Sequence, residues 1–175
     1  LRLIVNPKDE ESLKRVINYP PRGIGQTTVD KLVVASKNYN LSLLETIERS
    51  QEIGLPVNSG TLTKLNNFAT LIQRFQIENE GLNAFEITDL VTKKIGLVQE
   101  LKKDATPEGV ARIENIEELL NGIRDFTEGQ VELADATGSL AEFLEDVALA
   151  TDADKDNDPN SDRVSLMTIH LAKGL

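Results

Sequence analysis

The chain has no cysteine and only one histidine among its 175 residues. Without cysteine it has no disulfide framework, no thiol nucleophile and no cysteine-ligated zinc or iron–sulfur centre. A single histidine also excludes a metal site built from several histidines. No apolar run approaches the roughly 20 residues that a membrane-spanning helix needs. What is left is a globular chain, long enough to bury a core of its own.

Acidic residues outnumber basic ones, but the two kinds are unevenly placed. The chain has 29 acidic and 19 basic residues, a net charge of −10. Residues 1–40 carry seven basic and four acidic residues, whereas residues 41–175 carry 12 basic and 25 acidic ones. Phosphate binding needs lysine and arginine, so the first part can meet a polyanion and the later part would be repelled by it.

Apolar residues recur at spacings of three and four over most of the chain, which predicts helices. The predicted helices span residues 9–19, 27–38, 43–53, 59–80, 85–95, 97–104, 107–126 and 139–150. Only Arg163–Ile169 alternates as a strand does, and it has no strand partner. We therefore expect an all-α, multi-helix domain with one isolated β-strand near the C-terminus. No internal repeat is detected.

The ends of the sequence favour a piece of a longer protein. The chain begins at Leu1 without a methionine, and it stops at Leu175 directly after an apolar run. The sheet that would complete the isolated strand is then expected in the missing part.

The first candidate site is a turn between two predicted helices. Pro20 and Pro21 end one helix, and Gly23 and Gly25 flank Ile24, whose side chain can anchor the turn in the core. The first amides of the next helix lack intrahelical acceptors and lie at the positive end of its dipole, which suits a phosphate. The predicted phosphate-binding residues are Arg22, Gly23, Ile24, Gly25, Gln26, Thr27, Thr28 and Lys31. The simpler interpretation is an ordinary turn between packed helices.

This stretch resembles the helix-hairpin-helix element that contacts nucleic-acid backbones. Such an element positions a protein on the phosphates and does not read bases.

The second candidate site follows the predicted strand. Thr168, His170 and Lys173 place a hydroxyl, an imidazole and an ammonium where α/β sheets usually bind ligands. The alternative is a strand end that carries a surface histidine and lysine.

The sequence Thr-Ile-His-Leu-Ala-Lys-Gly-Leu at Thr168–Leu175 resembles motif V of the superfamily 1 DNA helicases of the UvrD/PcrA/Rep type. Leu171 stands where that family often has a small serine or threonine. Three further stretches resemble the family in the same order: Leu1–Asp9 with the residues leading to Gly25, Arg112–Leu119, and Phe143–Leu149. Together the similarities cover essentially the whole chain.

The resemblance implies that residues 1–160 are the helical domain 2B of such a helicase. Residues 161–175 would begin the return into its RecA-like domain 2A. The turn would contact duplex DNA. The motif V residues would contact single-stranded DNA and couple it to the nucleotide site; they are Thr168, His170, Ala172, Lys173 and Gly174.

The resemblance also implies the properties of the whole enzyme. It would be a bacterial, cytoplasmic helicase that hydrolyses ATP with Mg²⁺ and moves 3′ to 5′ along a single strand. Its partners would be DNA at a junction of duplex and single strand, its own other domains, and a regulatory protein on domain 2B. No membrane is implied.

The chain itself lacks the parts that would catalyse. It has no Gly-x-x-x-x-Gly-Lys-Ser/Thr loop, so we expect no ATP or Mg²⁺ binding, no catalytic residue and no ATPase activity in this fragment. Asp152–Asp158 resembles the start of a calcium loop, but Asn157 and Arg163 stand where glycine and glutamate are needed, so no metal site is predicted. Glu114, Glu117 and Glu118 are expected on a solvated helix face.

Two other classes of protein stay open. One is a stand-alone helix-hairpin-helix module of a repair enzyme, which would usually have a second hairpin and a more basic surface; the sequence shows neither. The other is a helical protein-interaction domain without DNA contact, which the net charge of −10 permits.

Overall fold

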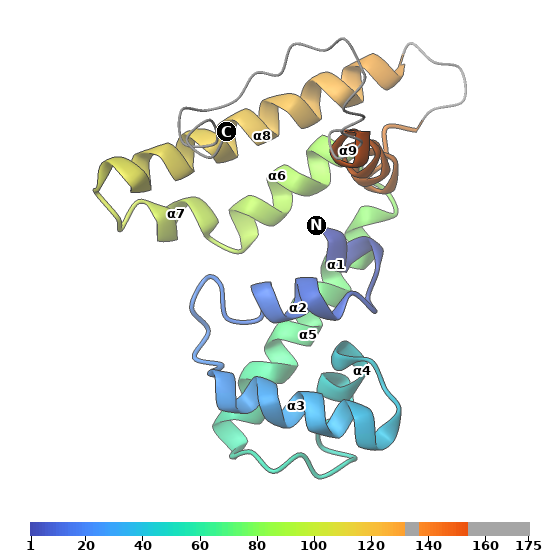
Figure 1. The fold of residues 1–175 in the computed structure, drawn as a ribbon, viewed down its shortest axis with the longest axis vertical. Coiled ribbons are helices and arrows are strands. Elements are labelled where there is room, and N and C mark those ends of the chain that lie inside the picture. Colours follow the sequence, from blue (N-terminus) through green and yellow to red (C-terminus); the bar gives the residue numbers. More distant parts are fainter. Residues whose placement is uncertain (132–136, 154–175) are drawn as a thin grey trace, which may run out of the picture. The chain divides into compact units, whose positions relative to one another are not determined.

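A computed structural model describes residues 1–131 and 137–153. The chain divides into two compact units, Leu1–Glu145 and Asp146–Leu175. The described part is helical and contains no strand, which confirms the prediction of an all-α domain (Figure 1). Its helices are α1 (Arg2–Val5), α2 (Glu10–Val16), α3 (Gln26–Tyr39), α4 (Leu43–Glu48), α5 (Ser59–Asn79), α6 (Ala84–Lys94), α7 (Leu97–Leu101), α8 (Pro107–Val131) and α9 (Leu140–Ala153). The predicted strand at Arg163–Ile169 and the predicted domain boundary at residue 160 lie outside the described residues.

Side-chain caps explain where several helices begin. In four of the described helices, a side-chain oxygen of the residue before the helix accepts a hydrogen bond from a backbone amide of the first turn. The capping residues are Asp9, Ser42, Asn58 and Asn83. Such caps satisfy amides that have no partner within the helix. The start of α3 differs from these four, because Gly25 precedes it and no side chain caps it, as is also the case at α1 and α7.

The helices match the predicted ranges with three main differences. The four-residue helix α1 is too short for apolar spacing to reveal. Helix α4 ends at Glu48, earlier than predicted, because the chain then folds into a turn in which the Leu55 amide donates to the Ser50 carbonyl at 2.9 Å. Helix α8 continues to Val131, beyond its predicted end near residue 126.

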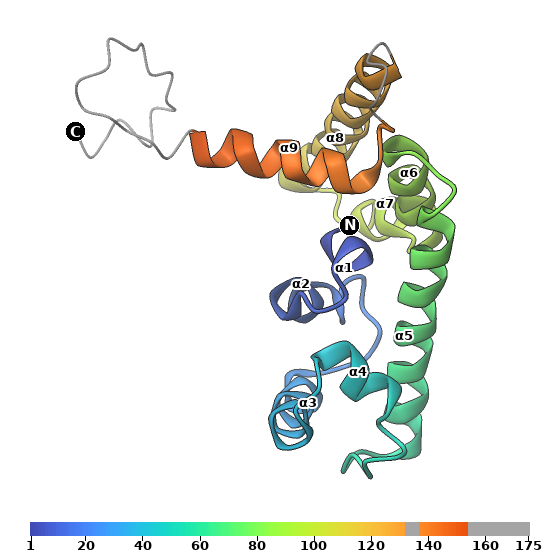
Figure 2. The ribbon, with the colours of Figure 1, turned by 90° about the vertical axis from the view of Figure 1, so that its right-hand side faces the viewer.

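Two hydrophobic clusters form the core of the first unit. One gathers buried side chains of α1 to α5, including Leu13, Leu32 and Phe68. The other lies among α1, α5, α6, α8 and the start of α9 and includes Phe75 and Ile123. Helix α5 contributes to both, and Figure 2 shows α1 to α4 along one side of it. The predicted apolar stripe of α5 is therefore core.

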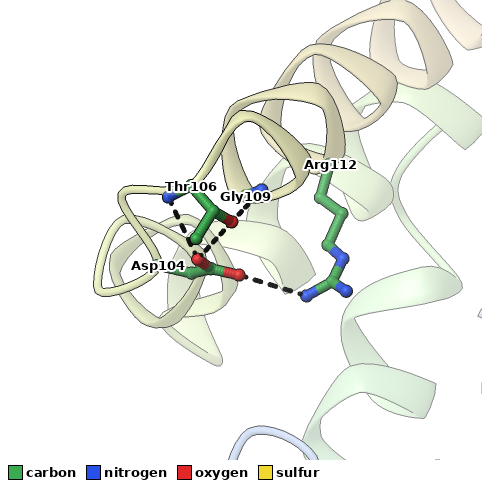
Figure 3. Close-up of polar contacts among 4 residues, drawn as sticks. All are labelled: Asp104, Thr106, Gly109 and Arg112. Carbon is green, nitrogen blue, oxygen red and sulfur yellow. Dashed lines mark hydrogen bonds and ion pairs between the residues drawn. The ribbon is translucent and has the colours of Figure 1, made fainter.

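A closed turn joins α7 to α8 (Figure 3). One carboxylate oxygen of Asp104 accepts the amide of Thr106 at 3.1 Å and its hydroxyl at 2.6 Å. The Thr106 hydroxyl oxygen accepts the Gly109 amide at 3.2 Å, and the other Asp104 oxygen lies 3.5 Å from the Arg112 guanidinium. Gly109 is buried against the Asp104 carbonyl, where a Cβ atom has no room. The turn thus depends on a glycine at position 109.

Among the helices of residues 1–131 and 137–153, none is long and apolar enough to cross a bilayer.

Candidate nucleic-acid interface

The side chain of Asn18 binds two backbone amides of the turn between α2 and α3. The Asn18 carboxamide oxygen accepts the amides of Arg22 at 2.9 Å and Ile24 at 3.0 Å. Gly23 has φ +68°, a backbone conformation that favours glycine. Ile24 is 1% exposed and packs in the first hydrophobic cluster, as predicted from its place between the two glycines. The turn is therefore anchored by the two amides that Asn18 binds and by the buried side chain of Ile24.

The Arg22 guanidinium points back toward α2. One of its nitrogens donates to the carbonyls of Val16 at 2.8 Å and Pro20 at 3.1 Å. The guanidinium carbon lies 5.5 Å from the centre of the Phe68 ring. Burial lowers the pKa of Arg22 from its usual value. Arg22 thus stabilises the turn from inside, and its charge is already in contact with backbone oxygens.

The start of α3 presents free amides. Gly25 has an extended conformation, with φ −82° and ψ 169°, and it and Gln26 and Thr27 are exposed. Within the described ranges, the amides of these three residues have no acceptor, whereas the Thr28 amide donates to the Gly25 carbonyl at 3.0 Å. Three free N–H groups at the positive end of a 14-residue helix favour an anion. The Ile24 amide is not among them, because it donates to Asn18.

The side chains around these amides are mixed in charge. The Gln26 carboxamide donates to the Asp30 carboxylate at 2.9 Å, so one acid lies a turn into α3. Thr27 is exposed and Thr28 is half-buried. The Lys31 ammonium donates to the Pro56 carbonyl at 2.7 Å, in the loop before α5. The predicted residues are thus gathered at one turn, with Arg22 and Ile24 facing inward and the remainder at the surface.

Lys64 is a cation at this turn that the sequence analysis did not identify. It belongs to α5 and is exposed, and its ammonium donates to the Gly23 carbonyl at 3.2 Å. A Cβ atom at Gly23 would lie 2.6 Å from the same nitrogen. Because 41 residues separate the two positions, no local spacing could have indicated the contact.

The other candidate residues contribute no site in the described part of the chain. The motif V residues Thr168, His170, Ala172, Lys173 and Gly174 lie outside it, as does most of the calcium-like stretch after Ala153. The side chains of Glu114, Glu117 and Glu118 are exposed on α8 as predicted. Within residues 1–131 and 137–153, no group of three or more histidine, aspartate or glutamate residues could hold a metal ion.

Comparison with known proteins identifies the relatives of the chain. A family model described as the UvrD-like helicase C-terminal domain matches residues 1–175. The chain is 37% identical over 175 residues to an ATP-dependent DNA helicase PcrA of Staphylococcus aureus. It is 35% identical to the protein of that name from Staphylococcus epidermidis and 34% identical to that from Leuconostoc citreum. Each match covers 100% of this chain and 23% of the relative.

Proposed function

The chain belongs to the UvrD-like helicase C-terminal domain family, and from this premise we propose that it is the mobile accessory domain 2B of a UvrD/PcrA-type DNA helicase. Residues 1–160 form domain 2B, and residues 161–175 begin the return into the RecA-like domain 2A. The chain spans 23% of the length of the curated relatives it matches. The proposal therefore assigns the motor to other parts of a longer bacterial, cytoplasmic enzyme.

In that enzyme, ATP and Mg²⁺ supply the energy for 3′ to 5′ movement along a single strand. The residues of this chain do not fit ATP or Mg²⁺. Its sequence has no phosphate-binding loop, and its described part has no cluster of metal-binding side chains. In this proposal, domain 2B contacts DNA and the enzyme's other domains, and it also binds a regulatory protein. Thr168, His170, Ala172, Lys173 and Gly174 contact the single strand and couple it to the nucleotide site.

The role of this chain is to hold the duplex by its backbone. The supporting observation is the uncapped start of α3, where the amides of Gly25, Gln26 and Thr27 are exposed and without acceptors among the described residues. The surface around them is shaped by Gly23, Thr28, Lys31, the half-buried Arg22 and the buried Ile24. Backbone amides bind a phosphate whatever base it carries. A helicase that moves along DNA needs such a contact, since it must not stop at a particular sequence.

We expect weak and salt-sensitive binding of duplex DNA by the 175-residue chain. Each cation that neutralises a phosphate steepens the dependence of log K on log salt by about 0.9. Two or three cations near the turn predict a slope of about −2 to −3. Fluorescence anisotropy of a labelled blunt duplex, titrated with the chain at rising salt, measures both the affinity and this slope. The chain should hydrolyse no ATP in the same buffer.

Three results would contradict the proposal. Tight duplex binding by a variant with both Gly23 and Gly25 replaced by bulky residues would exclude the turn as the contact. Absence of duplex binding at every salt concentration would favour the protein-interaction alternative. ATP turnover by the chain alone would mean that it contains a motor.

A single substitution removes one of the three amides without touching the helix. Proline is well tolerated at the first position of a helix, and Gln26 is that position in α3. The extended Gly25 already has the conformation that a following proline requires. We expect Gln26→Pro to weaken duplex binding by about tenfold or more, because one hydrogen bond to a charged group contributes about 1.5–3 kcal/mol. The melting temperature should stay within a few degrees.

Gln26→Ala is the matched control, because it removes the contact of Gln26 with Asp30 and keeps the amide. It should bind the duplex within about twofold of the unaltered chain. Equal affinities for the proline and alanine variants would mean that the Gln26 amide does not contact DNA.

A further inference from the structure

The turn before α5 repeats the turn before α3. Gly54 has φ +61°, close to the φ +68° of Gly23. The residue after each glycine is apolar and buried in the same cluster: Leu55 is 5% exposed and Ile24 is 1% exposed. A helix follows each turn. The segment from α4 to α5 is therefore a second helix–turn–helix unit with the same local design as the segment from α2 to α3.

A lysine followed by a leucine occupies the same place in both second helices. Lys31 is the sixth residue of α3 and Lys64 is the sixth residue of α5. The leucines after them, Leu32 and Leu65, are fully buried in the first cluster. The two units thus correspond beyond their turns, into the helices that follow.

The two lysines make reciprocal contacts. Lys31, in the helix that follows the first turn, donates to the Pro56 carbonyl of the second turn at 2.7 Å. Lys64, in the helix that follows the second turn, donates to the Gly23 carbonyl of the first turn at 3.2 Å. Each ammonium therefore ties its own helix to the other unit's turn, and the two units form one paired surface.

Lys64 is the better placed cation of this surface. Its side chain is exposed, and an ammonium has three donors, of which the Gly23 carbonyl uses one. It forms no ion pair with the described residues. Arg22, the arginine of the first turn, donates instead to the carbonyls of Val16 and Pro20. The turn therefore receives its available positive charge from a different helix.

We propose that Lys64 contacts a phosphate of the duplex and is held in place for this by the Gly23 carbonyl. The inference rests on the proposed function, and it adds the second helix–turn–helix unit to the DNA-binding surface. One ammonium donor fixes Lys64 at the Gly23 carbonyl, two residues before Gly25, whose amide is the first of the free amides. The remaining donors face the phosphate backbone, with which a lysine interacts as a compact charge.

The test is a salt titration of duplex binding by the full 175-residue chain and its variants. Lys64→Met should weaken binding to a labelled blunt duplex about tenfold and make the slope of log K against log salt shallower by about 1. Lys64→Arg keeps the charge and should restore the slope. Lys37→Met is the control, because Lys37 is exposed in the last turn of α3, about 16 Å along the axis from the start of that helix. Circular dichroism melting verifies that each variant is folded.

The outcomes separate this inference from the proposed function. If Gln26→Pro weakens binding and Lys64→Met changes neither affinity nor slope, the Lys64 inference is overturned and the function stands. A loss of affinity in Lys64→Met with an unchanged slope would also overturn it, since the lysine would then act on the turn alone. If the unaltered chain does not bind the duplex, both fail.

Discussion

Replacing Gly109 by alanine should lower the free energy of unfolding by about 2–3 kcal/mol, a large effect for one methyl group. The methyl group would overlap the Asp104 carbonyl oxygen and come within 2.8 Å of its carboxylate carbon. The Asp104 carboxylate cannot turn aside without losing its contacts with Thr106 and Arg112. The turn between α7 and α8 would have to open, and its hydrogen bonds would be lost.

Gly122→Ala is the matched control for this substitution. Gly122 lies in the same helix α8, and a Cβ atom there meets nothing within 4 Å. Because alanine favours a helix over glycine, this variant should gain about 0.5–1 kcal/mol. Urea unfolding followed by circular dichroism measures both changes. Equal stability of the two variants would show that position 109 has room for a side chain.

The helices could be predicted because their signals are local. The stripe from Leu65 to Phe75 is spaced as a helix face requires, and it is buried in α5. Asn58 and Asn83 mark the starts of α5 and α6 by caps that depend only on neighbouring residues. Helix α1 could not be found in this way, because four residues carry no periodic signal.

The candidate site was predictable only in part. The glycines and Ile24 indicated the turn, and the structure places Ile24 in the core. The Arg22 guanidinium also lies over the Phe68 ring, and the cation Lys64 comes from α5; both contacts join residues far apart in sequence. The correspondence of the two units was also hidden. Three residues separate Leu55 from α5 but one separates Ile24 from α3, so the sequences do not align without a gap.

Placing an aspartate at position 25 should abolish duplex binding while the fold becomes slightly more stable. Gly25 has the same extended conformation as Ser42, Asn58 and Asn83, whose side chains cap their helices. A Cβ atom at Gly25 meets nothing within 4 Å, so the new side chain fits without strain. Its carboxylate would accept the amides at the start of α3 and repel a phosphate there.

The expected sizes of the two effects differ greatly. Aspartate in place of glycine before a helix adds a few tenths of a kcal/mol of stability, and a negative charge at the helix start adds about 0.3–1 kcal/mol. Loss of two or more hydrogen bonds to a charged phosphate predicts affinity lower by about a hundredfold. Gly81→Asp is the control, because it adds the same charge beyond the far end of α5, about 25 Å along that helix from Lys64.

The most direct measurement is the affinity of Gly25→Asp for a labelled blunt duplex at low salt, read beside its melting temperature and beside Gly81→Asp. We expect Gly25→Asp to lose about a hundredfold in affinity with a melting temperature at or above that of the unaltered chain. Gly81→Asp should lose no more than about threefold, as a distant exposed charge does. Duplex binding by Gly25→Asp equal to that of Gly81→Asp would show that DNA does not contact the start of α3.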